Sequence, residues 1–105
     1  MITSGSGKYR VWLEKHQIGS DLVFFLGGGE RPHVGGMVVC EKGKPAQVVS
    51  LEGHYDAMVL TFLAEAACKK YGQTVVFIGG IHIDRASKDE IEMLVQNCRL
   101  LIPEL

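Results

Sequence analysis

The first half of the chain alternates between apolar and polar positions with the two-residue period of β-strands. In residues 9–14, Val11 and Leu13 fall on one face and Trp12 on the other, which predicts a half-buried strand. Residues 21–26 are apolar on both faces, so we expect this second strand in the centre of a sheet or covered on both sides.

Turn-forming residues separate these strands from two more. A Gly-Ser turn at 18–21 joins the first pair, and a glycine-rich loop at 27–36 leads to a third strand at 34–41. A turn at 41–45 precedes a fourth strand at 46–52. Strands joined by such turns predict an antiparallel meander.

The period changes to that of helices in the second half. Residues 57–71 predict a helix with Asp56 as its N-cap and Gly72 just past its end. This helix is apolar nearly all round, which predicts burial against the sheet and against a second copy of the chain in a homodimer. A fifth strand follows at 73–78, and residues 81–84 alternate and continue it past a bulge or kink.

A second helix is predicted near the C-terminus. Ser87 and Glu90 form a capping box at its start, and Pro103 ends it. Its apolar stripe comprises Ile91, Leu94, Val95, Cys98 and Ile102. The elements predict an α+β fold in which a mainly antiparallel sheet of about five or six strands, in the order β-β-β-β-α-β-α, carries two helices. We expect a single domain over residues 1–105, with a frayed segment at 3–7.

Composition narrows the classes of function. The chain has 105 residues, a net charge of −1 and no basic block, which argues against nucleic acid as a partner. Its apolar runs are far shorter than the roughly 18 residues of a membrane span, and its first residues do not resemble a signal peptide. Cys40, Cys68 and Cys98 are an odd number of cysteines in apolar stretches, which predicts buried free thiols in a cytoplasmic protein.

Chain direction brings most of the chemically versatile residues to one edge of the predicted sheet. Successive elements reverse direction, so the glycine-rich loop, the end of the fifth strand and the starts of both helices share this edge. The side chains it collects are three of the four histidines and three carboxylates, namely His33, His54, His82, Glu30, Asp56 and Asp84. Both helix starts have their own caps, so an anion is expected at the amides of Gly27, Gly28 and Gly29 with Arg31.

Each of these residues also has a purely structural interpretation. The loop could be a wide turn, and His54 and Asp56 could be local capping partners.

Imidazoles and a carboxylate could hold a zinc ion, although the long spacings between His33, His54 and His82 give no local ligand pair. No serine or cysteine stands in a nucleophile-type turn, so no catalytic residue is predicted.

Three spaced motifs resemble the prenylated-flavin chaperones, the small D-type subunits that accompany gallate and related aromatic-acid decarboxylases. The motifs are Gly-Gly-Glu-Arg-Pro-His-Val-Gly at 28–35, Gly-His-Tyr-Asp at 53–56, and Gly-Ile-His-Ile-Asp at 80–84 followed by Ser-Lys-Asp-Glu-Ile at 87–91. Element order and chain length also fit, so the resemblance covers nearly the whole chain. The family often has Lys where this chain has Tyr55, so no charged role is carried over to that position.

The resemblance implies the fold of proteasome assembly chaperones and a non-catalytic protein that binds reduced prenylated FMN, or FMN, and passes it to a UbiD-like decarboxylase subunit. The residues that would hold the flavin belong to the three motifs and are Gly28, Gly29, Arg31, His33, Gly53, His54, Asp56, Gly80, His82 and Asp84. Tyr55, Met58 and Ile81 would form an apolar wall beside them. Two alternatives stay open: a protein assembly chaperone without a small-molecule ligand, and a small metal enzyme that uses the histidines.

Overall fold

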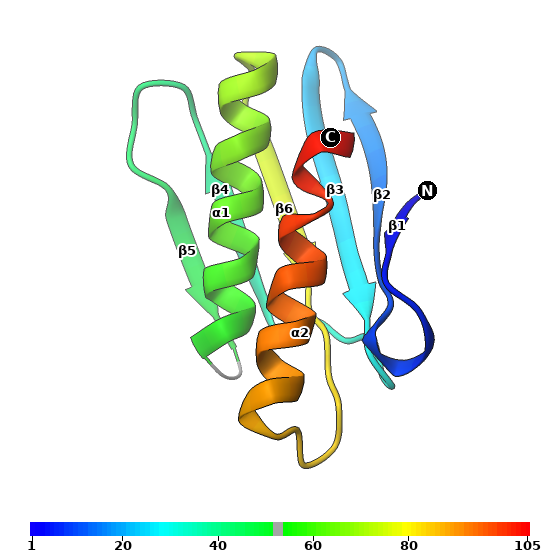
Figure 1. Ribbon diagram of the computed structural model, residues 1–105. Helices are drawn as coiled ribbons and strands as arrows, with labels where there is room; N and C mark the ends of the chain where they lie inside the picture. The colour runs from blue at the N-terminus through cyan, green and yellow to red at the C-terminus, as the bar shows by residue number, and fades with distance from the viewer. Residues whose placement is uncertain (52–53) are drawn as a thin grey trace.

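Six strands and two α-helices form two layers in the computed structural model, with both α-helices on one face of a single sheet (Figure 1). The backbone is described for residues 1–51 and 54–105, and the side chains for residues 1–51 and 56–105. The elements, with η for a short 3-10 helix, are β1 (Ile2–Ser4), η1 (Gly7–Tyr9), β2 (Val11–Ile18), β3 (Asp21–Gly28), β4 (Gly36–Cys40), β5 (Gln47–Ser50), α1 (His54–Tyr71), β6 (Val75–Gly79), α2 (Lys88–Arg99) and η2 (Ile102–Glu104).

The strands lie in the order β1-β2-β3-β6-β4-β5. All neighbouring strands are antiparallel except β3 and β6, which are parallel with Phe24 opposite Phe77. The predicted α+β class with a mainly antiparallel sheet is therefore confirmed. The predicted meander is wrong in one respect, because β6 lies between β3 and β4. The loop from β3 to β4 is long because it must step over the end of β6.

The strand directions agree with the prediction although the neighbours differ. Since β6 is parallel to β3 and antiparallel to β4, it ends where β3 ends and β4 begins. Both α-helices also begin there, at the lower end of the view in Figure 1. We call this end of the molecule, formed by residues 29–35, residues 80–84 and the first turns of α1 and α2, the site edge.

The hydrophobic core lies between the sheet and the two helices. Phe24 and Phe77 stack at its centre with ring centroids 4.5 Å apart. Other large side chains that are fully buried around them are Leu13, Leu60, Leu63, Ile81, Leu94 and Leu101. The opposite face of the sheet carries the partly exposed side chains of Trp12, Phe25 and Ile78. β3 is thus central in the sheet, as predicted, and the helices cover one of its faces.

Helix α1 begins at His54, so Asp56 lies inside its first turn and the predicted N-cap position is wrong. Its predicted end is confirmed, because Gly72 has φ +66° and donates its N–H to the carbonyl of Cys68 at 2.8 Å. The apolar side chains of α1 pack on the sheet and on α2, and Phe62 lies under the guanidinium of Arg99, 4.5 Å from its ring centroid. The all-round apolar sequence of α1 is therefore largely accounted for within one copy of the chain.

The N-terminal segment forms structure where the sequence predicts fraying. β1 pairs with β2, with Ile2 opposite Leu13. Tyr9 belongs to η1 instead of the predicted strand, and its hydroxyl donates to Glu90 at 3.0 Å. The amide of Asn97 donates to the carbonyl of Tyr9 at 2.8 Å. A strand of three residues is too short to show a period, so only these contacts reveal it.

The predicted capping box at the start of α2 is present. The N–H of Glu90 donates to Ser87 Oγ at 3.1 Å, and the N–H of Ser87 donates to Glu90 Oε1 at 3.0 Å. On the apolar stripe, Leu94 and Cys98 are buried. The box and the stripe together fix where α2 starts and which side faces the sheet.

All three cysteines are buried and free, as predicted. Burial raises the pKa of the Cys98 thiol to about 12 and that of the Cys40 thiol to about 11. A protonated thiol is a poor nucleophile, so these side chains behave as small core residues. In the described ranges, neither α-helix has the length and apolar character that crossing a membrane requires.

Candidate functional site

The loop from β3 to β4 lies against the segment that follows β6. Gly29 and His82 form a bridge between the two. The N–H groups of Glu30 and Arg31 donate to the carbonyl of His82 at 2.7 and 3.2 Å, and the N–H of Gly29 donates to the carbonyl of Arg10 at 3.0 Å. These three amides are used within the protein, and the amide of Gly29 belongs to the expected anion cradle of Gly27, Gly28 and Gly29. The side chain of Arg31 is then the loop group best suited to an anion.

Close packing explains the run of glycines in this loop. A Cβ atom at Gly27 would collide with the indole of Trp12, and one at Gly29 would collide with the backbone of His82. Gly29 also has φ +72°, which side chains rarely adopt. The glycines therefore allow the loop to approach its neighbours, which is a structural role beside any role in binding.

The carboxylate of Asp84 holds two of the predicted site residues. Its Oδ1 lies 2.7 Å from a guanidinium nitrogen of Arg31 and 2.8 Å from Nε2 of His82. The N–H of Asp84 donates to Glu30 Oε1 at 2.9 Å. The hydrogen bond from His82, and then the charge of Arg31, lower the pKa of Asp84. Arg31 is 66 % exposed, so a ligand anion can reach it.

Asp56 is the buried carboxylate of the site. Its Oδ1 accepts a hydrogen bond of 3.3 Å from the N–H of Ile81, and its Oδ2 lies 3.4 Å from Nε2 of His33. A Cβ atom at Gly35 would collide with this carboxylate, so glycine is needed for the loop to pass it. A buried charge is costly without partners, so the carboxylate of Asp56 favours an arrangement that keeps both contacts. These contacts connect α1 with the loop and with the end of β6.

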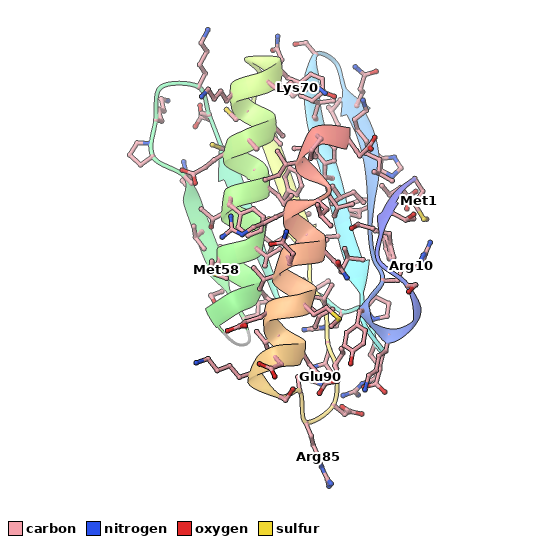
Figure 2. The ribbon with its side chains drawn as sticks, viewed as in Figure 1. Met1, Arg10, Met58, Lys70, Arg85 and Glu90 are labelled. Atoms are coloured by element: carbon pink, nitrogen blue, oxygen red, sulfur yellow. The ribbon has the colours of Figure 1, made fainter. Side chains whose placement is uncertain are left out.

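A polar cleft of about 260 Å³ at the site edge is lined by Arg31, Pro32, His33 and His82. The rings of His33 and His82 meet edge to face, with centroids 5.7 Å apart. Arg85, at the same edge, has φ +52° and points away from the body of the protein (Figure 2). The polar cleft thus combines one guanidinium with two imidazoles whose orientations are set by carboxylates.

The structure brings five of the ten predicted binding residues together through their side chains: Arg31, His33, Asp56, His82 and Asp84. Gly28, Gly29 and Gly80 contribute backbone, each in close contact with a neighbouring segment. Gly53 and the side chain of His54 lie outside the described residues.

The predicted apolar wall is wrong for Ile81, which is fully buried in the core. The alternation of residues 81–84 places Ile81 and Ile83 on the helix side of the sheet and His82 on the other side. Met58 is 45 % exposed on α1, and the side chain of Tyr55 lies outside the described residues.

A second hollow, which sequence reasoning missed, adjoins the polar cleft. This apolar hollow of about 340 Å³ is lined mainly by Trp12, Phe25, Leu26, Val34 and Ile78, and it shares Pro32 and His33 with the polar cleft. Its signal in the sequence is Trp12, which faces away from Val11 and Leu13 and therefore away from the core.

For the alternative of a metal enzyme, the described part of the chain offers no ready metal site. Among those residues, no group of three or more His, Cys, Asp or Glu side chains is placed to hold a metal ion.

Comparison with protein families identifies the chain. A sequence model described as prenylated flavin chaperone LpdD-like domain matches residues 5–105. A search among curated proteins gives no significant match. Because the family match covers nearly the whole chain, this protein belongs to the family of LpdD-like prenylated flavin chaperones.

Proposed function

We propose that the protein binds reduced prenylated FMN without turning it over and passes it to a UbiD-like aromatic-acid decarboxylase. The observation that carries the proposal is the polar cleft, where Arg31, His33 and His82 converge in a chain that belongs to a flavin chaperone family. Binding of a nucleotide phosphate suits the planar, permanently charged guanidinium of Arg31. The imidazoles of His33 and His82 supply hydrogen bonds to the polar edge of the ligand.

The pairing of Arg31 with Asp84 suits temporary binding. An exposed ion pair contributes little free energy, so a phosphate group can replace Asp84 as the partner of Arg31. After the flavin leaves, Asp84 pairs with Arg31 again. The cleft therefore holds an anion in an exchangeable way, which is what delivery to another protein requires.

The proposal includes a cytoplasmic homodimer. Three free thiols suit a reducing compartment. Exposed apolar side chains gather on and near the edge strand β5, where Val48 and Val49 are each 47 % exposed and Leu51 is 62 % exposed. An unpaired strand edge with apolar side chains favours contact with a second copy. Sedimentation analysis should give the mass of a dimer, and a monomer at all concentrations would remove this part of the proposal.

Anaerobic gel filtration tests the binding step. The protein is mixed with reduced prenylated FMN, and the absorbance that co-elutes with it is measured. Arg31→Ala should weaken retention about 10- to 150-fold, because a charge-assisted hydrogen bond is lost. Arg85→Ala is the matched control, since it removes the same charge at the same edge from a side chain that points away, and it should retain the ligand (Figure 2).

A transfer assay tests the delivery step. The loaded protein is mixed with a decarboxylase that lacks its cofactor, and decarboxylation is compared with that obtained from free reduced prenylated FMN. A higher activity with the loaded protein is expected. If no flavin is retained but a partner protein is bound, the chain is an assembly chaperone without a small-molecule ligand.

A further inference from the structure

The floor of the apolar hollow is an aromatic surface on the sheet face opposite the helices. Trp12 and Gly27 are cross-strand partners of β2 and β3, and the indole lies so close to Gly27 that a Cβ atom there would collide with it. Phe25, two positions before Gly27 on the same face, is 38 % exposed. Glycine at position 27 thus lets the indole lie low over β3 and leaves room above it.

The apolar hollow lies next to the polar cleft. They share Pro32 and His33, and beyond these residues the lining changes from Arg31 and His82 to Trp12 and Phe25. Ligand sites of small molecules typically measure about 300–1,000 Å³ and combine apolar walls with a few polar groups. The polar cleft alone, at about 260 Å³, is below this range, and the apolar hollow adds about 340 Å³.

We infer that the apolar hollow is the subsite for the flavin ring system, with the face of the ring against Trp12 and Phe25 and the phosphate in the polar cleft. This assignment rests on the proposed function and adds the orientation of the ligand to it. A flavin is a flat aromatic ring system joined by a polar chain to a phosphate. Flat rings pack favourably against aromatic side chains, and the apolar hollow offers such a surface beside the polar cleft with its guanidinium.

The single tryptophan of the chain makes the assignment testable by NMR. The indole N–H of Trp12 gives one assignable signal, and the fully reduced flavin is diamagnetic. Anaerobic titration with reduced prenylated FMN should shift this signal, because a ring stacked on the indole changes its magnetic environment. Inorganic phosphate should leave the signal in place. A shift with phosphate alone would overturn the assignment, since the signal would then report anion binding.

Two variants of exposed side chains test the same surface by affinity. Phe25→Ser and Val34→Ser should each weaken retention of reduced prenylated FMN about tenfold. Ile18→Ser is the control, because Ile18 is 68 % exposed on β2 at the far end of the strand from the site edge.

The possible results separate this inference from the proposed function. If flavin is retained but the indole signal does not move, the ring binds elsewhere. The same follows if both variants keep the affinity of the unmodified protein. Either result overturns the inference and leaves the proposed function standing. No retained flavin in the unmodified protein overturns both. A dimer that dissociates in Phe25→Ser, with unchanged flavin affinity, would make this face the contact between two copies and would also overturn the inference.

Discussion

The carboxylate of Asp56, in the first turn of α1, accepts a hydrogen bond of 3.3 Å from the backbone N–H of Ile81, just beyond the end of β6. Both residues are buried, with exposed fractions of 4 % and 0 %. The bond joins the start of a helix to the end of a strand that follows it in the chain. It therefore fixes the position of the segment that carries His82 relative to the first turn of α1.

Replacement of Asp56 should destabilise the fold. Asp56→Ala leaves the buried N–H of Ile81 without its acceptor, which should lower the free energy of unfolding by about 1–3 kcal/mol. Asp56→Asn keeps an acceptor of the same shape and should cost less. Urea denaturation of the three proteins measures the difference. Equal stability of Asp56→Ala and the unmodified protein would show that this bond does not hold the site edge.

Removal of the carboxylate at Asp84 should strengthen flavin binding. Asp84 neutralises Arg31 and places a negative charge beside the expected phosphate, so Asp84→Asn should raise the affinity for reduced prenylated FMN about two- to fivefold. Asp89→Asn removes the same charge from the exposed first turn of α2 and should have a smaller effect. A weaker affinity in Asp84→Asn would mean that Asp84 contacts the ligand or that its hold on His82 matters more.

Glycine at position 79 should contribute strongly to the stability of the fold. Gly79 has φ +137°, and a Cβ atom there would collide with the backbone carbonyl of Leu26 on β3. Gly79→Ala should therefore lower the free energy of unfolding by about 3 kcal/mol. Gly43 also has a positive φ, of +78°, but a Cβ atom there meets nothing within 4 Å. Gly43→Ala should cost only about 1 kcal/mol, and equal losses in urea denaturation would contradict the steric argument.

Glu90 should make stability depend on acidic pH. The backbone N–H of Ser87, and then the side chains of Lys8 and Tyr9, lower the pKa of Glu90 from 4.5 to about 2. A carboxyl with a lower pKa in the folded state stabilises the fold above its ordinary pKa and loses this effect as the pH falls. The unfolding free energy should therefore drop between pH 4.5 and about 2.

Glu90→Gln should flatten that part of the pH profile, because glutamine does not titrate. Glu92→Gln, on an exposed position of the same helix, is the matched control and should keep the slope of the unmodified protein. Urea unfolding across the interval measures both. The same slope in Glu90→Gln would assign the pH dependence to other carboxylates.

The cysteines should be unreactive in the native protein. Burial holds the pKa of the Cys40 and Cys98 thiols at about 11 and about 12, so almost no thiolate is present at neutral pH. A thiol-specific dye should label the three cysteines only after unfolding in urea. Rapid labelling of a native thiol would point to a reactive cysteine.

The sequence predicts the directions of the strands better than their neighbours. Direction follows from local turns, such as Gly19 with φ +63° between β2 and β3. The position of β6 depends on long-range packing, including the stack of Phe24 on Phe77, and no local pattern encodes it. The three residues of β1 escape detection because so short a strand has no readable period.

For the candidate site too, local patterns are predictable from the sequence and long-range contacts are not. Alternation around His82 predicts that it points away from Ile81, and the structure places it in the polar cleft. The hydrogen bonds that occupy the N–H groups of the glycine loop come from partners distant in sequence, such as Gly29 with Arg10, so the sequence could not reveal them. The alternation of residues 11–13 predicts that Trp12 points away from the core. That Trp12 and His33 line the same hollow depends on the path of the loop.

The position of β6 between β3 and β4 also determines when the sheet can be completed during synthesis. Its two neighbours, β3 and β4, precede α1 in the chain, whereas β6 follows it. A chain emerging from the ribosome therefore lacks a central strand of its sheet until β6 has been synthesised. Pairing across such separations is slow, because loop closure costs entropy before the contacts form. The polar cleft joins residues of the loop between β3 and β4 to His82, which follows β6 in the chain. A bound flavin would therefore also report that synthesis and folding of the sheet are complete.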